Sequence, residues 1–158
     1  MVPLIRAQSQ CTFTSDFRLP TNMGGQMNIV IVGCGRVGAL LATNLDHKGH
    51  NVTVIDQEAD AFNRLPTGFK GRTVLGSGID IDVQQRAGIE QADAFVACSP
   101  GDNRNIAASQ VAREIFHVPK VVARINDPLR DQIFRDLGLK TVCPTLVGAD
   151  LVRDALLR

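Results

Sequence analysis

Short apolar runs alternate with stretches of helical periodicity from residue 27 to the end of the chain. The runs are rich in valine and isoleucine, which favour strands, whereas the stretches between them repeat apolar residues at every third or fourth position. Strands are predicted at 29–32, in a second run that ends at 56, and at 72–75, 94–98, 120–125 and 140–143. Helices are predicted around 39–45, at 59–65, 81–87, 103–116 and 129–137, and from 146 onward.

Strands that alternate with helices imply right-handed crossovers and a parallel sheet. We therefore expect an α/β fold, a Rossmann-like, doubly wound sheet of six parallel strands in the order 3-2-1-4-5-6, with helices on both faces. In that strand order, ligands bind in the crevice between strands 1 and 4.

Three glycines follow the first predicted strand with the spacing G-x-G-x-x-G: Gly33, Gly35 and Gly38. Gly33 would permit the tight turn out of the strand, Gly35 would let the backbone approach a phosphate, and Gly38 would let the helix pack closely. The phosphate would lie on the free N–H groups at the start of the helix. Because three glycines also align by chance, glycines that serve packing alone are the alternative.

Asp56 ends the second strand, at the distance from Gly33 that a dinucleotide-binding βαβ unit requires. Its carboxylate is placed to accept hydrogen bonds from ribose hydroxyls, and its charge would repel a 2′-phosphate. NADP is therefore disfavoured as a ligand.

The composition is that of an ordinary globular chain: 158 residues, 44% apolar and 21% charged, with a net charge of +1. The near-neutral charge argues against nucleic acid as a partner, and no apolar run approaches the roughly 20 residues that span a bilayer. The four cysteines, Cys11, Cys34, Cys98 and Cys143, are widely spaced, so they indicate neither a zinc site nor a disulfide framework. A reducing cytoplasm fits this usage.

Residues 1–26 carry Ser, Thr, Gln and Pro without a sustained period and lack the apolar segment of a signal peptide. We interpret them as a flexible arm, either an extension from an upstream start or an expression remnant, because Met27 directly precedes the first strand. The alternative is an ordered arm that docks on a partner through Phe13 and Phe17.

In five stretches the chain resembles the nucleotide-binding lobe of the RCK (KTN) proteins, cytosolic regulators of the Trk and Ktr potassium uptake systems and of some potassium channels. The stretches are GCGRVG at 33–38, GHNVTVID at 49–56, GSGID at 76–80, AGIEQADA at 87–94 and ARINDP at 123–128. Five stretches in the same order are more specific than one glycine motif. The resemblance covers residues 27–145, which we expect to form the nucleotide-binding domain.

This resemblance implies a sensor of adenine nucleotides, NAD(H), ATP or ADP, that gates a Trk/Ktr-type potassium transporter. The expected partner is a membrane-embedded potassium-translocating subunit, which would place the chain in the cytoplasm at the inner face of the cell membrane. The apolar helix at 146–158 would then cross to a neighbouring subunit and form a dimer or a ring of dimers; packing on the chain's own sheet is the alternative. Many family members continue with a second lobe, so the chain is either a piece of a longer protein or a short regulator. A domain that binds nucleotide for stability alone is also possible.

The resemblance also implies ligand contacts on the first three strands. Arg36 matches an arginine that reaches distal phosphates, although it could be a solvated arginine at a helix start, and Val37 follows it in the same loop. Ser77, Gly78 and Ile79 match a turn that lies along the adenine, with serine in place of the usual aspartate. The neighbouring Asp80 is expected to cap the next helix rather than to bind ligand.

Two further site residues are expected on strands four and five. Cys98 would lie opposite the glycine loop, near Cys34; a redox pair is conceivable, but buried cysteines usually act as small apolar side chains. Arg124 matches an arginine of the family's Ala-Arg-x-Asn stretch, and the resemblance implies that it meets a phosphate or a partner subunit. The alternative is a salt bridge with Asp127 or Asp131. Where some family members carry an acidic residue associated with a divalent cation, this chain has Thr145, so no metal dependence follows.

The alternative function is a small NAD-dependent oxidoreductase or a fragment of one. Such an enzyme needs a proton donor or acceptor at the substrate carbonyl, usually His, Tyr or Lys. The chain has no tyrosine, and its three histidines, His47, His50 and His117, fall outside the predicted crevice. We therefore expect no catalysis.

Overall fold

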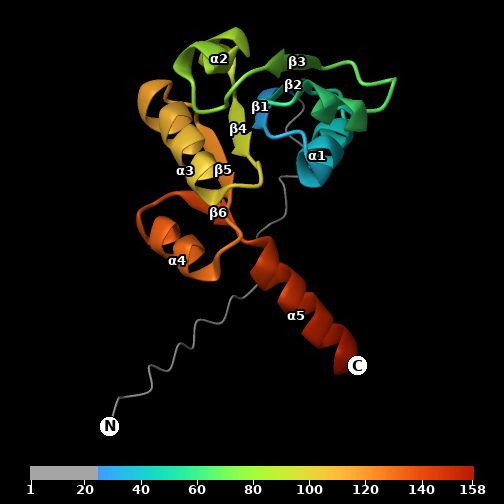
Figure 1. Cartoon of the computed structure of the whole chain (residues 1–158), viewed down its shortest axis with the longest axis vertical. Helices are drawn as coiled ribbons and strands as arrows, with labels where there is room; N and C mark the ends of the chain where they lie inside the picture. Colours follow the sequence, from blue (N-terminus) through green and yellow to red (C-terminus); the bar gives the residue numbers. More distant parts are fainter. Residues whose placement is uncertain (1–24) are drawn as a thin grey trace.

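The computed structural model describes residues 25–158 and contains one six-stranded sheet (Figure 1). Every strand pair is parallel, and the order is β3-β2-β1-β4-β5-β6, as the sequence predicts. The strands are β1 Asn28–Val32, β2 Asn51–Asp56, β3 Arg72–Leu75, β4 Ala94–Ala97, β5 Lys120–Arg124 and β6 Lys140–Val142. The predicted arm at 1–26 lies outside the described residues except for its last two, of which Gln26 donates a hydrogen bond to Asn51.

The helical segments are α1 Arg36–His47, η1 Ala59–Arg64, α2 Ile81–Arg86, η2 Ile89–Gln91, α3 Asp102–Gln110, η3 Val111–Ile115, α4 Pro128–Asp136 and α5 Pro144–Leu156. Two of the predicted α-helices contain another type of helix. The segment expected as a helix at 59–65 is the 3₁₀-helix η1, and the long helix expected at 103–116 is α3 followed by the π-helical turn η3. The final helix begins two residues before the predicted start, because Pro144 suits the first turn of a helix.

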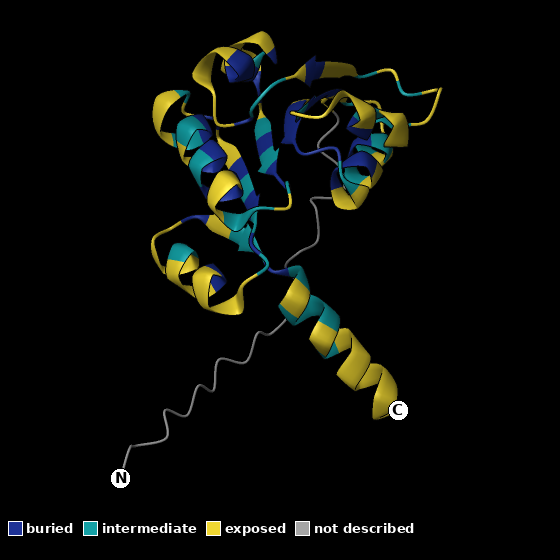
Figure 2. Cartoon of the chain, in the orientation of Figure 1, coloured by how far each residue is buried: buried dark blue, intermediate teal, exposed yellow. Residues whose placement is uncertain are grey.

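Helices cover both faces of the sheet, as expected, and each face has its own hydrophobic cluster (Figure 2). Side chains alternate along β1, so Ile29 and Ile31 pack beneath α1 and η1, while Val30 and Val32 pack beneath α2 and α3. The sheet is therefore buried on both sides, which explains why its strands read as continuous apolar runs.

Two helices begin with the side-chain caps that their sequences favour. Asp80 accepts a hydrogen bond from the N–H of Asp82 at the start of α2, which confirms its predicted role as a cap. Asp127 caps α4 in the same way, with Pro128 in the first turn.

The last helix, α5, extends away from the rest of the fold (Figures 1 and 2). None of its residues is buried, and Leu151, Val152 and Leu156 are between 61% and 79% exposed. The predicted alternative, in which α5 packs on the chain's own sheet, is therefore wrong. Within residues 25–158, no helix combines the length and apolarity that crossing a membrane requires.

Candidate functional site

The predicted site residues on the glycine turn lie where β1 meets β4. Gly33 has a φ of +98°, and a Cβ atom there would lie 2.7 Å from the backbone nitrogen of Ser99, at the end of β4. A Cβ atom on Gly38 would collide with the carbonyl oxygen of Gly33. Both glycines are therefore needed for the close packing of the turn, the helix and β4.

Gly35, by contrast, faces open space. No atom lies within 4 Å of the position that its Cβ would take. The residue begins α1 without a side-chain cap, so the first N–H groups of the helix are not satisfied by a side chain. Arg36 and Val37, in the first turn, are both exposed. This geometry suits an anion such as a phosphate. The uncapped N–H groups lie at the positive end of the helix dipole, and the space beside Gly35 is open to a ligand.

The carboxylate of Asp56 contacts the glycine turn directly. One oxygen accepts a hydrogen bond from the N–H of Cys34 at 2.6 Å, and the other accepts one from the N–H of Glu58 at 3.0 Å. Each carboxylate oxygen can accept more than one hydrogen bond. Asp56 is half-buried and can therefore still accept hydrogen bonds from the hydroxyls of a ribose.

The turn after β3 lies against the end of β1. A Cβ atom on Gly78 would collide with the Val32 side chain, so the turn approaches the strand as closely as glycine allows. The N–H of Gly76 donates to the Asp56 carbonyl at 2.8 Å, which joins this turn to β2. Ser77 is half-buried and Ile79 is 38% exposed, so both side chains are accessible at the carboxyl end of the sheet.

At the end of β4, Cys98 is buried against the glycine turn, and its thiol lies 3.6 Å from the Gly33 carbonyl oxygen that it donates to. Burial raises the pKa of the Cys98 thiol to about 12, and burial followed by the charge of Asp56 raises the pKa of the Cys34 thiol. Thiols with raised pKa values are poor nucleophiles, which favours the structural interpretation of both cysteines over a redox pair.

Arg124, at the end of β5, is half-buried and points back toward β4. Its Nη1 donates to the Cys98 carbonyl oxygen at 3.4 Å, and its Nε is buried without a partner among residues 25–158. The predicted alternative, a salt bridge to Asp127 or Asp131, is wrong, because these carboxylates pair instead with arginines on α4 itself. Those arginines lie three and four residues further along the helix, where side chains meet most easily.

Several polar residues that no sequence pattern predicts hold this site together. Asn105 is fully buried; its side-chain oxygen accepts from the N–H and hydroxyl of Ser99, and its amide donates to the carbonyls of Ser99 and Arg124. Gln84, also fully buried, donates to the carbonyls of Gly78 at 2.7 Å and Ala108 at 3.1 Å. Both are polar residues in helices, and hydrophobic patterning alone assigns such residues to the solvent face. Each has one partner six residues away and another 19 or 24 residues away.

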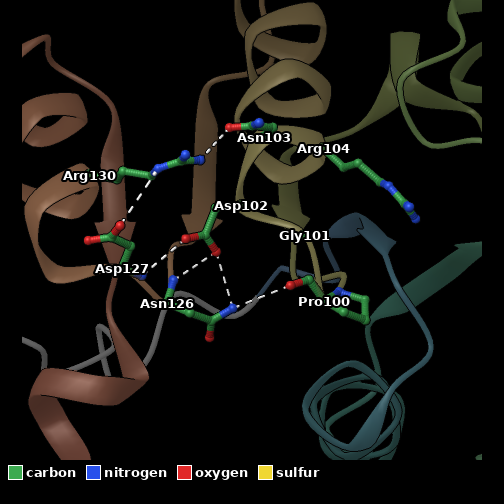
Figure 3. Close-up of a pocket in the computed structure, with 8 residues that line it drawn as sticks. All are labelled: Pro100, Gly101, Asp102, Asn103, Arg104, Asn126, Asp127 and Arg130. Atoms are coloured by element: carbon green, nitrogen blue, oxygen red, sulfur yellow. Dashed lines mark hydrogen bonds and ion pairs between the residues drawn. The ribbon is translucent and has the colours of Figure 1, made fainter.

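A pocket of about 570 Å³ opens beside this site, between the segments that follow β4 and β5 (Figure 3). Its floor is an Asp102 carboxylate that accepts hydrogen bonds from the backbone N–H groups of Asn126 and Asp127, at 2.9 and 3.0 Å. Arg130 lines the opposite side and bonds Asn103 and Asp127, whereas Arg104 extends away from this cluster (Figure 3).

The three histidines lie at the opposite end of the strands from the glycine turn. His47 and His50 precede β2, and His117 precedes β5, so all are at the amino ends of strands. His50 accepts a hydrogen bond from the N–H of Met27 there. Among residues 25–158, no three His, Cys, Asp or Glu side chains gather closely enough to hold a metal ion.

Comparison with known proteins identifies the family. Residues 29–145 match the family model of the TrkA-N domain. The chain belongs to the TrkA-N family. It is 50% identical over 131 residues to a Trk system potassium uptake protein TrkA of Streptomyces coelicolor, an alignment that covers 83% of this chain and 59% of that relative. The chain therefore spans about three fifths of the relative's length.

Solved structures of this family share the fold. The TrkA-N domain of the inner membrane protein ybaL from Escherichia coli superimposes with a TM-score of 0.73 at 21% identity, covering 85% of this chain and 99% of that chain. The structure of GsuK bound to ADP superimposes with a TM-score of 0.70 at 25% identity, covering 82% of this chain and 34% of that chain. A GsuK RCK domain also superimposes, with a TM-score of 0.70 at 24% identity over 84% of this chain and 28% of that one. Together with the TrkA-N match and the Streptomyces relative, this shared fold confirms the predicted resemblance.

Proposed function

We propose that this TrkA-N chain binds an adenine nucleotide in the crevice between β1 and β4 and regulates a Trk/Ktr-type potassium transporter. Residues 27–145 are the proposed binding domain. The proposed contacts are Gly33, Gly35, Arg36, Val37 and Gly38 for the phosphates, Asp56 for the ribose, Ser77, Gly78 and Ile79 for the adenine, and Cys98 and Arg124 for the far end of the ligand.

This proposal rests on one observation: the Asp56 carboxylate and the uncapped start of α1 lie at the same turn. Asp56 bonds the N–H of Cys34, and α1 begins two residues later at Arg36, beside the open space at Gly35. In these nucleotides the first phosphate is esterified to the 5′-oxygen of the ribose, so a single ligand can reach both groups. The ADP bound to the related GsuK supports a nucleotide of this class.

The ligand is NAD(H), ATP or ADP. Asp56 suits the ribose of any of these, while the exposed Arg36 favours a ligand with several phosphates. The proposed role is regulatory rather than catalytic, because the histidines lie at the opposite end of the strands and the chain contains no tyrosine.

Regulation requires a second element whose arrangement depends on the ligand. The proposed element is α5, whose exposed leucines would pack on a second copy of the chain to form a dimer or a ring of dimers. The assembly would dock on a membrane-embedded potassium-translocating subunit, at the inner face of the cell membrane. The name of the Streptomyces relative supports a role in potassium uptake.

Calorimetric titration of the full chain with NAD, NADH, ATP and ADP tests this function, with oligomer size followed by light scattering in parallel. We expect saturable binding of at least one nucleotide, loss of that binding in Asp56→Ala, and a change in assembly on binding. Leu151→Gln should give a monomer that still binds nucleotide, because Leu151 is exposed and belongs to α5, which extends away from the rest of the fold. Absence of binding to all four nucleotides would contradict the proposal, and turnover of any of them would favour the oxidoreductase instead.

A further inference from the structure

Arg104, in the first turn of α3, makes a contact that crosses the crevice. Its Nη1 donates to the side-chain oxygen of Gln57 at 3.4 Å. Gln57 directly follows β2, and α3 follows β4, while β1 lies between these two strands in the sheet. The side chain therefore passes over the carboxyl end of β1, where the glycine turn begins. Figure 3 shows it extending away from Asp102 and Asn126 toward the blue and teal ribbons of the first part of the chain.

The charge of Arg104 is not neutralised by a neighbouring carboxylate. Among residues 25–158, Arg104 takes part in no ion pair. Arg130, which lines the same pocket, is paired with Asp127 and also bonds Asn103. The bond from Arg104 to an exposed amide at 3.4 Å is long, so a stronger acceptor can replace it at little cost.

The position of Arg104 in its helix also favours an anion. A cation in the first turn is at the unfavourable end of the helix dipole, and Gly101, the residue before α3, supplies no side-chain cap. An anion near the guanidinium would interact favourably with both the arginine and the helix start. Arg36, exposed in the first turn of α1, is a second arginine next to the glycine turn.

We propose that Arg104 binds the second phosphate of the nucleotide and selects ligands with at least two linked phosphates over AMP and adenosine. This assignment rests on the proposed function, because it assumes that the first phosphate lies on the start of α1. From there the phosphate chain runs toward β4, under the arginine that spans β1. On binding, the guanidinium exchanges the Gln57 amide for two phosphate oxygens, which suits its planar pair of donors.

Titration of the full chain and of Arg104→Gln with adenosine, AMP, ADP and ATP tests this assignment. We expect the affinities for ADP and ATP to fall by about tenfold or more, while those for adenosine and AMP change less than about twofold. Arg104→Lys should keep part of the affinity, because it keeps the charge and loses the paired donors. Arg104 is exposed, so these variants should fold as the wild type does.

Two control variants separate a phosphate contact from other roles. Arg130→Gln removes a neighbouring arginine that already has a partner, and it should leave all four affinities unchanged. Gln57→Ala frees the guanidinium, and it should keep or raise the affinity for ATP.

Three results would overturn the assignment: equal losses for AMP and ATP in Arg104→Gln, no loss for ADP and ATP, or a loss in Gln57→Ala as large as that in Arg104→Gln. If the wild-type chain binds none of the four compounds and neither NAD nor NADH, the proposed function itself fails. If it binds NAD or NADH and Arg104→Gln binds the same compound with the same affinity, the role of Arg104 fails and the proposed function stands. If the wild type binds ADP and Arg104→Gln binds it equally well, the role of Arg104 fails and the proposed function stands.

Discussion

Asp102 accepts hydrogen bonds from both the backbone N–H and the side-chain amide of Asn126, at 2.9 and 3.1 Å. The carbonyl oxygen of Asn126 in turn accepts a hydrogen bond from the Thr145 hydroxyl at 2.7 Å, at the base of α5. The start of α3, the end of β5 and the start of α5 are thus joined by one short chain of hydrogen bonds. A change in the position of α3 on ligand binding would reach α5 through these bonds.

Removing the Asp102 carboxylate should loosen this junction. Asp102→Ala leaves the N–H groups of Asn126 and Asp127 without their acceptor, so we expect the free energy of unfolding to fall by about 1–3 kcal/mol. Asp102→Asn keeps one acceptor oxygen, so its free energy of unfolding should fall by less than that of Asp102→Ala. Urea unfolding followed by circular dichroism measures both changes; equal stability of Asp102→Ala and the wild type would show that the junction contributes nothing.

Two glycines of the same turn should respond differently to substitution by alanine. Gly33→Ala forces a side chain into a left-handed conformation against Ser99, so we expect a loss of at least about 2 kcal/mol of unfolding free energy. Gly35→Ala places its methyl group in open space and should change stability by less than about 1 kcal/mol.

The functional effect of Gly35→Ala should be larger than its effect on stability. Its methyl group would occupy the approach to the first N–H groups of α1, so nucleotide affinity should fall by about tenfold or more. Thermal unfolding and calorimetry on the same samples separate the two quantities. Unchanged affinity in a stably folded Gly35→Ala would exclude a phosphate at this turn.

The charge of Asp56 should make the crevice discriminate against a 2′-phosphate. We expect NADP to bind at least about tenfold more weakly than NAD, because the added phosphate would lie near the carboxylate. Asp56→Asn removes the charge while keeping an acceptor for the Cys34 N–H, so the difference between the two ligands should narrow. Competition titration measures the ratio, and equal affinities in the wild type would remove the ribose assignment.

The buried thiols should be inert at neutral pH. With the pKa of Cys98 raised to about 12, only about one molecule in ten thousand carries the thiolate at pH 8. In a Cys11→Ser variant, whose remaining thiols Cys34, Cys98 and Cys143 are all buried, we expect no rapid reaction with Ellman's reagent until urea is added. Rapid labelling of the folded protein would instead support a redox role.

The same shift has a consequence for stability at alkaline pH. The pKa of Cys98 is higher in the folded chain than the ordinary value of 9.0, so the folded state holds its proton more tightly. Its contribution to stability is present below pH 9 and is lost as the pH rises toward 12. Unfolding measured across this range in the wild type and in Cys98→Ala should show a steeper decline in the wild type.

Much of the fold could be predicted from the sequence because its signals are local. Buried parallel strands appear as apolar runs, and Gly33, Gly38 and Asp80 have conformations or contacts that their residue types favour. The residues that hold the site together gave no such signal. Asn105 and Gln84 are polar helix residues whose partners lie up to 24 residues away, so their burial follows from tertiary packing alone.

The contacts of the arginines could not be predicted from the sequence either. A salt bridge from Arg124 to Asp127 or Asp131 is one alternative that the sequence allows, but Arg130 and Arg135 reach those carboxylates from the next turn of α4. Arg104 belongs to no recognised sequence motif. Its contact with Gln57 across the end of β1 depends on the strand order rather than on residues near it in the sequence.

The most direct test of nucleotide binding in the crevice is a crystal structure of the full chain grown with ADP. We predict phosphate density against the first N–H groups of α1 and the ribose hydroxyls within hydrogen-bond distance of Asp56. ADP at any other place on the molecule, or a crevice that stays empty in crystals saturated in turn with ADP, ATP, NAD and NADH, would contradict the proposed function.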